Sequence, residues 1–561
     1  MIGTVLETLG VGFVVPAMAL ITQPDYAERI PALRSIVTAL GNPKTEVLVV
    51  GAMLALAGIF AVKNVFLAFL AWFQTRFAYG VQARLSQSLF DAYMSQPYSF
   101  HLRHNSAQLI RNVTGEVDIL RGSGLIPGTT LVSEVFVLAG LFALLVVVEP
   151  LGALIVMAVL GATSWVSYRL TRTYVARWGQ ARQRHEGARI QHLQQGFGGV
   201  KDVKLYGREV EFLGLYRAHN EGNARAGRLQ FTLLQFPRMW LELLAMIGLA
   251  ILVLAMVVQG RPLESVLPTL ALFAAAAFRV LPSVNRILTA VQALRFGVPA
   301  LNAVHAELGL TRPLRMAAAT SSPFRTALEL RDVTFAYPDS GKPSLQSVAL
   351  SVHRGETIGF IGASGSGKST LVDVILGLLM PDSGAVCVDG QDIRNNLRSW
   401  QDQIGYVPQS IYLTDDTLRR NVAFGLPDKL IDALAVERAI RAAQLDEFAQ
   451  SLPQGLDTVV GERGVRLSGG QRQRIGIARA LYHDPAVLVL DEATSSLDVE
   501  TERGVMESVI ALQANKTILI VAHRVSTVAH CDRVYRMDRG SIVEEGVPAA
   551  MLSISKLAKP V

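Results

Sequence analysis

The sequence predicts an α-helical transmembrane domain of six spans with long cytoplasmic extensions, followed by an α/β domain of the P-loop class. Half of the 561 residues are hydrophobic and only 18% are charged, and the mean hydropathy is +0.34. A soluble enzyme of this length is less apolar. After about residue 324, short β-rich runs alternate with helical patterns, and a complete phosphate-loop motif follows.

Six apolar stretches are expected to span the membrane, because most of them reach the ~20 residues that a helix needs to cross a bilayer. They cover residues 2–22, 46–73, 126–148, 150–168, 231–259 and 263–290. The expected domains are a transmembrane domain at 1–308, a linker of small residues and turn formers at 309–324, and a nucleotide-binding domain at 325–561.

Two long polar intervals, 74–125 and 169–230, are rich in arginine. The positive-inside rule therefore places both in the cytoplasm, and it accounts for the net charge of +7 without a nucleic-acid partner. Each interval is expected to form two helices joined by a short crossing segment, at 97–105 and 207–216. No cleavable signal peptide is expected. Cys387 and Cys531 are too few for a disulfide framework or a zinc site.

The phosphate-loop motif lies between an expected strand at 357–361 and an expected helix at 371–376, which is the context that the motif needs. Its glycines let backbone N–H groups approach phosphate oxygens, and the helix N-terminus favours an anion. Lys368 is expected to reach the β- and γ-phosphates and Ser369 to bind Mg²⁺. The nucleotide-binding residues expected here are Gly362, Ala363, Ser364, Gly365, Ser366, Gly367, Lys368, Ser369 and Thr370.

A second apolar strand, 486–490, ends in two carboxylates. Asp491 is expected to hold Mg²⁺, and Glu492 is placed to act as the general base on the attacking water. A purely structural carboxylate at this position is the alternative.

Between the phosphate loop and the acid pair stands Leu467-Ser468-Gly469-Gly470-Gln471. Together the three motifs resemble the ATP-binding cassette (ABC) ATPases, and the resemblance covers 325–561. It implies that this signature contacts a nucleotide held by another cassette. The Ser468 hydroxyl, the bare backbone of Gly469 and Gly470 and a helix beginning at Gln471 would then bind an anion. One cassette per chain implies a homodimer with two composite ATP sites.

Further motifs of that family follow in the expected order. Tyr337 matches the aromatic residue that stacks on adenine, although a core tyrosine is the alternative. Gln409 matches the glutamine that senses Mg²⁺ and takes part in catalysis. His523 matches the histidine that holds the γ-phosphate, although a structural histidine is the alternative. The segments 461–464 and 495–498 match loops that face the membrane domain and the partner cassette.

Six spans followed by a cassette resemble the ABC half-transporter exporters over the whole chain. That resemblance implies ATP hydrolysis coupled to transport across the cell inner membrane, with the ATPase domain in the cytoplasm. Residues 24–45 are predicted to form an external amphipathic helix whose apolar face includes Tyr26, Ile30 and Leu33. This face would contact a lipid surface, or simply pack as a loop helix. With the segments 105–112 and 278–286, it is similar to the bacterial lipid-linked oligosaccharide flippases.

Three cations lie in or near expected spans: Lys63, Arg279 and Arg286. Intramembrane cations usually face an aqueous cavity, and arginine pairs well with phosphate. They would suit an amphipathic lipid-linked substrate with a pyrophosphate head. The alternatives are snorkelling and internal ion pairs with Glu7, Glu134 or Glu242. A lipid A-like or multidrug exporter is a rival function, and an ATP-gated channel or regulatory subunit is a rival of another class.

Overall fold

The computed structural model describes residues 45–148, 150–258, 263–310, 323–338, 340–461, 464, 467–493, 499–512, 516–522 and 525–551. The chain divides into two compact units. The helical unit comprises Met1–Gln96 and His101–Pro313. The cassette unit comprises Leu314–Val561 together with the tetrapeptide Pro97–Phe100. The first predicted span and the predicted external helix, with Tyr26, Ile30 and Leu33, lie outside the described residues.

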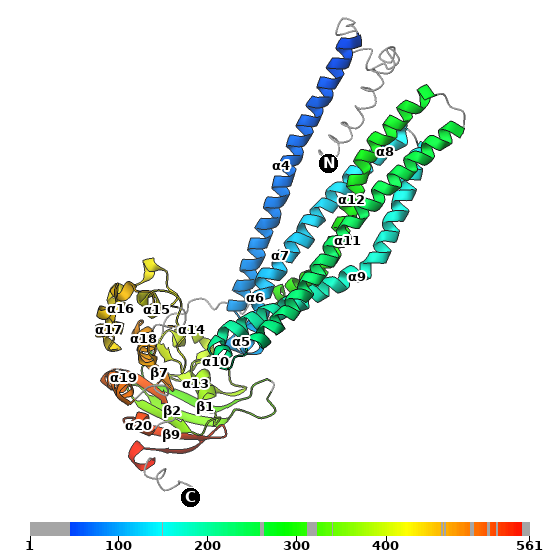
Figure 1. The fold of residues 1–561 in the computed structure, drawn as a ribbon. Coiled ribbons are helices and arrows are strands. Elements are labelled where there is room, and N and C mark those ends of the chain that lie inside the picture. Colours follow the sequence, from blue (N-terminus) through cyan, green and yellow to red (C-terminus); the bar gives the residue numbers. More distant parts are fainter. Residues whose placement is uncertain are drawn as a thin grey trace. The chain divides into compact units, whose positions relative to one another are not determined.

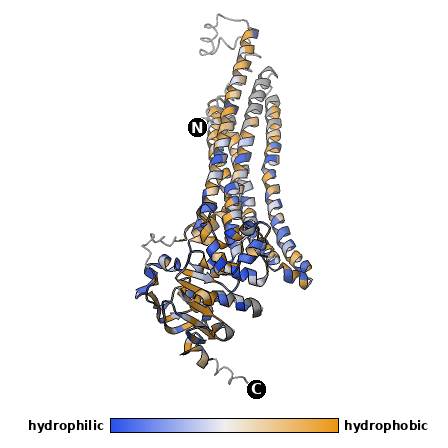
Figure 2. Cartoon of the chain, turned by 90° about the vertical axis from the view of Figure 1, so that its left-hand side faces the viewer, coloured by the Kyte–Doolittle hydropathy of each residue, from blue (hydrophilic) through white to orange (hydrophobic). Residues whose placement is uncertain are grey.

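Long helices build the helical unit (Figure 1). They are α4 (Thr45–Met94), α8 (Ile126–Val148), α9 (Pro150–Gly198), α11 (Glu209–Val258) and α12 (Leu263–Leu308). Helices α8, α9, α11 and α12 pack around one small apolar cluster that includes Leu141, Leu160 and Leu241. Hydrophobic residues dominate one end of these helices, and polar residues mix in toward the other (Figure 2).

Three helical segments within the described residues are long and apolar enough to cross a membrane, namely Glu46–Met94, Ser106–Val147 and Val280–Leu308. The first contains the predicted span 46–73, and the second contains all but the last residue of the predicted span 126–148. The third overlaps only the end of the stretch predicted at 263–290.

The two polar intervals differ in how closely they match the sequence prediction. The first contains the short helix α5 (Tyr98–Arg103), inside the predicted crossing segment at 97–105. The second crossing segment was placed wrongly at 207–216. Helix α9 runs to Gly198, α10 covers Val200–Leu205, and α11 already begins at Glu209. The helix breaks earlier because Gly198 and Gly199 are adjacent, and Gly207, with φ of 61°, ends the turn before α11.

The helix that follows α5 is interrupted by π-helical turns that the sequence did not reveal. Its parts are α6 (Ser106–Arg111), η1 (Asn112–Glu116), α7 (Val117–Ile119) and η2 (Leu120–Leu125). In η1, the fully buried Glu116 accepts a 2.6 Å bond from Arg182 of α9, and Asn112 donates to Glu307 of α12 at 3.0 Å. These polar contacts connect the irregular segment to two long helices.

Two sheets form the cassette unit (Figure 1). The four-stranded antiparallel sheet has the order β2-β1-β4-β5, made of β1 (Ala327–Phe335), β2 (Leu345–His353), β4 (Ser383–Val388) and β5 (Gln391–Asp392). The six-stranded sheet has the order β10-β9-β3-β8-β7-β6. Its strands are β3 (Thr357–Gly362), β6 (Ile404–Val407), β7 (Val487–Asp491), β8 (Thr517–Val521), β9 (Arg533–Asp538) and β10 (Ser541–Gly546). In the described part of this sheet, β10 pairs antiparallel with β9, and all other neighbouring strands pair parallel.

Helices complete the cassette unit and bury both faces of the six-stranded sheet. They are α13 (Lys368–Ile375), α14 (Leu397–Gln401), α15 (Leu418–Val422), α16 (Ala433–Ala442), α17 (Asp446–Ser451), α18 (Gly469–Leu481), α19 (Val499–Leu512) and α20 (Val525–Val528). Val487 and Val489 of β7 join the apolar cluster that contains α13, whereas Leu488 and Leu490 join the cluster that contains α18. This continuous burial is typical of a parallel sheet covered on both sides.

Candidate functional site: a nucleotide-binding cassette

The phosphate loop has the strand–loop–helix form that the sequence predicted. Strand β3 lies between β8 and β9, and α13 begins at Lys368. Gly367 has a φ of 102°, and a Cβ there would lie 2.8 Å from the Ser344 carbonyl oxygen, so glycine is required. Gly365 has a φ of 78°, and a Cβ there would meet nothing within 4 Å. The loop therefore exposes bare backbone before a helix N-terminus, which suits a phosphate.

Lys368 is turned into this loop and is 5% exposed. Its Nζ donates to the carbonyl oxygens of Gly362 and Ala363, each at 2.9 Å, and contacts the Ser366 Oγ at 3.4 Å. Burial lowers the pKa of Lys368, while the charges of Glu492 and Asp491 act in the opposite direction. The ammonium group thus lies among the atoms that would surround the nucleotide phosphates.

The acid pair stands at the carboxyl end of the fully buried strand β7, as predicted. Asp491 is 8% exposed, and Glu492 has a φ of 49°, a left-handed conformation that non-glycine residues seldom adopt. Such strain is concentrated at functional sites. The Gln409 Nε2 donates to the Glu492 Oε2 at 2.7 Å, so the structure brings together two of the predicted catalytic residues.

The oxygen donors at the start of α13 and the end of β7 have the chemistry that a magnesium ion needs. The Ser369 hydroxyl lies in the first turn of α13, and the Asp491 carboxylate ends β7. Helix α13 packs against β7, and hydroxyl and carboxylate oxygens are the ligands that Mg²⁺ prefers. Ser369 and Asp491 would hold the ion, whereas the contact that the structure gives Gln409 is with Glu492.

Tyr337 follows β1 and lies close to the phosphate loop. Its hydroxyl is 3.4 Å from the Thr370 Oγ1, and its ring meets that of Phe335 edge to face, with 5.1 Å between the centroids. The ring is half-buried against the same apolar cluster as α13. Both predicted alternatives, adenine stacking and core packing, are compatible with this position.

The signature motif starts a helix, although not at the residue expected. Helix α18 begins at Gly469 rather than Gln471, because Ser468 is its N-cap. The Ser468 Oγ accepts from the Gln471 N–H at 3.2 Å, and the Gln471 Oε1 accepts from the Ser468 N–H at 2.9 Å. This capping box fixes the exposed Ser468 and leaves the glycines in the first turn, where N–H groups attract an anion.

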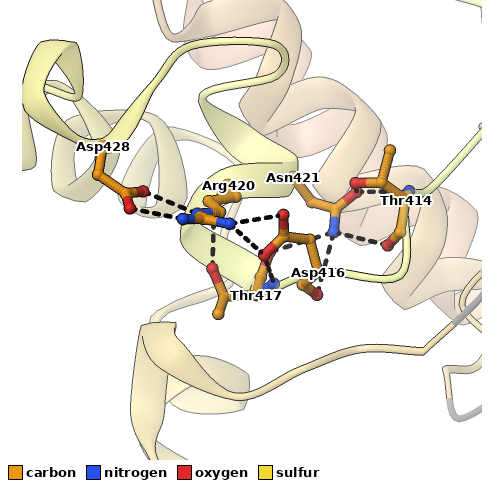
Figure 3. A network of polar contacts seen from close by, with 6 residues as sticks. All are labelled: Thr414, Asp416, Thr417, Arg420, Asn421 and Asp428. Atoms are coloured by element: carbon orange, nitrogen blue, oxygen red, sulfur yellow. Dashed lines mark hydrogen bonds and ion pairs between the residues drawn. The ribbon is translucent and has the colours of Figure 1, made fainter. Parts of the chain in front are cut away.

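The segment after Gln409 is held rigid by a polar network (Figure 3). Arg420 of α15 pairs with Asp416 at 3.1 Å and with Asp428 at 2.5 Å. Asn421 accepts from the Thr414 N–H at 3.0 Å and donates to the Thr414 carbonyl oxygen at 3.1 Å. The chain that leaves β6 is therefore fixed on both sides of α15. His523 and the loop segments 462–463 and 494–498 lie outside the described residues.

Sequence reasoning missed two side chains next to the acid pair. The Tyr406 hydroxyl of β6 lies 3.4 Å from the Asp491 Oδ2. Burial, with a smaller effect of the Asp491 charge, raises the pKa of Asp373 in α13 to about 6. Alternation along β6 predicts only that Ile404 and Tyr406 share one face of the sheet, and the structure shows that this is the face that α13 covers.

The predicted membrane cations have different surroundings. The Arg286 Nε lies 3.1 Å from the Glu134 Oε1, so one of the ion pairs considered above is formed. Glu242 instead pairs with Arg238 at 2.7 Å. The Lys63 Nζ lies 4.2 Å from the centroid of the Phe60 ring. Arg279 lies in α12, but its side chain is outside the described set.

Comparison with known proteins decides the family. A family model described as ABC transporter matches residues 345–495, and one described as ABC transporter transmembrane region matches residues 30–278. A protein of Thiobacillus denitrificans named ATP-dependent lipid A-core flippase is 33% identical over 89% of this chain and 86% of its own length. The chain belongs to the ABC transporter family.

Other relatives agree with this assignment. An ATP-dependent lipid A-core flippase of Aromatoleum aromaticum is 32% identical over 95% of this chain and 87% of its own length. The solved structure of a bacterial Atm1-family ABC exporter with ATP bound superposes with a TM-score of 0.80, covering 100% of this chain and 98% of that one at 22% identity. This ABC transporter therefore has the exporter fold. It binds a nucleotide in its cassette and couples ATP hydrolysis to transport across a membrane.

Proposed function

We propose that this ABC transporter is a homodimer of the inner membrane, with its cassettes in the cytoplasm, that flips a glycolipid with an anionic, phosphate-bearing head. The observation that supports an anionic head is Arg286, a cation in α12 that pairs with a buried carboxylate. Its side chain is 46% exposed, whereas that of its partner Glu134 is 9% exposed. Glu134 orients the guanidinium while the remaining donors stay accessible to a phosphate.

Two glycolipid classes share this chemistry. The names of the curated relatives support a lipid A-core head. The likeness of the segments 105–112 and 278–286 to lipid-linked oligosaccharide flippases supports a polyprenyl-pyrophosphate glycan. We favour the lipid A type because the relatives match most of the chain.

In the proposed ATP cycle, the cassettes of two protomers close on two nucleotides. Lys368 and the phosphate loop of one protomer hold the phosphates of ATP. The signature helix of the other protomer, which Ser468 caps in this chain, contacts the same nucleotide from the opposite side.

Hydrolysis is proposed to depend on the acid pair. Glu492 takes a proton from the attacking water, and Gln409 orients Glu492 through their 2.7 Å bond. Mg²⁺, held by Ser369 and Asp491, would neutralise charge on the phosphates. His523 is proposed to hold the γ-phosphate.

Vesicle reconstitution tests the substrate. ATPase stimulation and the loss of headgroup accessibility would be measured for a lipid A-core glycolipid, a polyprenyl-pyrophosphate glycan and a hydrophobic dye. Arg286→Ala is expected to weaken the response to limiting glycolipid several-fold, whereas Arg238→Ala, which breaks an exposed pair with Glu242, is the matched control. Unchanged flipping by Arg286→Ala would remove Arg286 from the site, and a response to dyes alone would indicate a multidrug exporter.

Subunit mixing tests the homodimer. If each signature completes the partner's site, a mixture of Lys368→Ala and Ser468→Arg chains will form dimers with one intact composite site. ATPase activity above that of either variant alone is the expected result. Mixtures as inactive as the separate variants, despite verified mixed dimers, would contradict paired sites.

A further inference from the structure

The strand that leads to Gln409 also carries a tyrosine that reaches the neighbouring carboxylate. Strand β6 is the edge strand next to β7, and Tyr406 lies in register with Val489 in this parallel pair. Val489 and Asp491 are two residues apart on β7, so both side chains point to the face covered by α13. Tyr406 points to the same face, and its ring packs on the same apolar cluster. A long aromatic side chain in this register can therefore extend toward the end of β7.

The hydroxyl of Tyr406 is the polar end of that side chain. It donates to the Asp491 Oδ2 at 3.4 Å, a long bond of the kind that tightens when a catalytic site closes on its ligands. A tyrosine hydroxyl ordinarily keeps its proton at neutral pH, and this one lies within hydrogen-bond distance of a carboxylate oxygen. It is a neutral donor that faces carboxylates.

We propose that Tyr406 is a positioning residue for the metal-binding carboxylate Asp491. The inference rests on the proposed role of Asp491 as a Mg²⁺ ligand and adds the residue that orients it. The packed ring fixes where the hydroxyl sits, and the hydroxyl restricts rotation of the carboxylate about its χ angles. Ordering the carboxylate in advance removes part of the entropy that metal binding would otherwise lose.

The stretch from Tyr406 to Gln409 contacts both carboxylates of the acid pair. Tyr406 contacts Asp491, and Gln409, three residues later, contacts Glu492. One short stretch therefore positions both members of the acid pair. A displacement of β6 or of the segment fixed by the Arg420 network would change the geometry of the metal ligand and of the general base together.

Tyr406→Phe isolates the hydroxyl because the ring and its packing are retained. Tyr482→Phe is the matched control, since the Tyr482 hydroxyl accepts a 2.9 Å bond from the Asp432 N–H elsewhere in the cassette. With full-length protein and ATP, the dissociation constant for Mn²⁺ would be measured by electron paramagnetic resonance. Nucleotide binding in EDTA checks that each variant is folded.

The expected result is a roughly three- to tenfold weaker Mn²⁺ affinity in Tyr406→Phe, as for the loss of one hydrogen bond to a carboxylate. The apparent Mg²⁺ constant for ATPase should rise by a similar factor while the rate at saturating Mg²⁺ changes less. Tyr482→Phe should match the wild type. Asp491→Asn separates the two hypotheses. If Asp491→Asn leaves Mn²⁺ affinity unchanged, the metal role itself is wrong; if it weakens Mn²⁺ binding while Tyr406→Phe does not, only the positioning role is overturned.

Discussion

The cassette unit and the helical unit differ in how many apolar side chains they expose and in how many charged side chains they bury. In the cassette, the fully buried positions are mostly apolar, and two large clusters cover the two faces of the six-stranded sheet. In the helical unit, Leu54, Val65 and Phe73 of α4 are more than half exposed, whereas Glu116 and Asn112 are almost completely buried. Apolar groups thus face inward in one unit and outward in much of the other.

The surrounding medium explains this difference. In water, burial of apolar surface drives the cassette to form a core. Lipid tails are as apolar as leucine, so membrane helices associate through close packing and polar contacts instead. A Cβ on Gly179 of α9 would lie 2.5 Å from the Phe296 carbonyl oxygen of α12. Small residues and buried charges therefore add to the apolar packing that holds the long helices together.

The largest expected effect is on ATP hydrolysis, the chemistry carried by the cassette unit. Glu492→Gln removes the proposed base but keeps the size of the side chain and its neighbour Gln409. ATP hydrolysis should fall by about 10²- to 10⁴-fold, with ATP still bound, because base catalysis typically contributes that much. Single-turnover hydrolysis and retained radiolabelled ATP would be measured. A variant with full activity would contradict the assignment of Glu492 as the general base. A changed thermal midpoint of the helical unit would contradict the expectation that this substitution affects the cassette unit alone.

Matched phenylalanines compare apolar burial directly. Phe360 of β3 is fully buried, whereas Phe73 of α4 is 56% exposed. Phe360→Ala should cost about 3–5 kcal/mol, because it leaves a cavity in a packed core. Phe73→Ala should change the unfolding free energy by only about 0.5 kcal/mol. Denaturant unfolding in detergent checks both. An equal cost would indicate that another chain covers this face of α4.

Matched ion pairs compare polar burial. Glu116 accepts from Arg182 at 2.6 Å and lies 3.5 Å from Arg111, and all three side chains are largely buried. Glu242 pairs with Arg238 at 2.7 Å, with both side chains more than half exposed. Glu116→Gln should cost about 3 kcal/mol, because it leaves buried arginines without their counter-charge. Glu242→Gln should cost less than Glu116→Gln, because both members of its pair are exposed.

Thermal unfolding of the purified transporter would measure both substitutions. If Glu116→Gln cost no more stability than Glu242→Gln, the contrast between buried and exposed ion pairs would be wrong, since water would then have to reach Glu116. A larger effect of Glu242→Gln would instead indicate that its surface is covered in the functional assembly.

The parts of the protein that sequence predicted well are those whose chemistry fixes local spacing. The phosphate loop, the acid pair and the capped signature helix depend on backbone geometry within a few residues, so their types and order are readable. The exact start of α18 was two residues off because Ser468 caps the helix and so draws both glycines into its first turn.

Long-range contacts could not be predicted in this way. The bond from Gln409 to Glu492 and that from Tyr406 to Asp491 depend on β6 lying next to β7, which no local pattern specifies. The π-helical turns at η1 and η2 depend on tertiary contacts of Asn112 and Glu116. The pairing of Arg286 with Glu134 was one of several open possibilities until α8 and α12 were placed together.

The smallest expected effect is the pH dependence of stability at the contact between α9 and α11, within the polar interval 169–230. The Nδ1 atoms of His185 in α9 and His219 in α11 lie 3.1 Å apart, which requires a donor on one ring and an acceptor on the other. His192 of α9 stacks on His219, with 5.2 Å between the ring centroids. Burial, and to a lesser degree His219 and Arg184, lower the pKa of His185. The α9 side of the α9–α11 contact is thus sensitive to added protons through His185.

The sign follows from linkage. Because the folded pKa of His185 is lowered, the unfolded chain binds the proton first as pH falls below about 6.5. The contribution of His185 to stability is therefore complete above that pH and is lost as pH falls through the folded pKa. The thermal midpoint of the helical unit should drop by a few degrees between pH 7.5 and 5.5, and by less in His185→Gln. Substitution of the exposed His305 in α12 should leave the slope unchanged. If His185→Gln kept the full wild-type dependence of the thermal midpoint on pH, the acid sensitivity would belong to other groups. The contact between His185 and His219 would then be only a packing contact between α9 and α11.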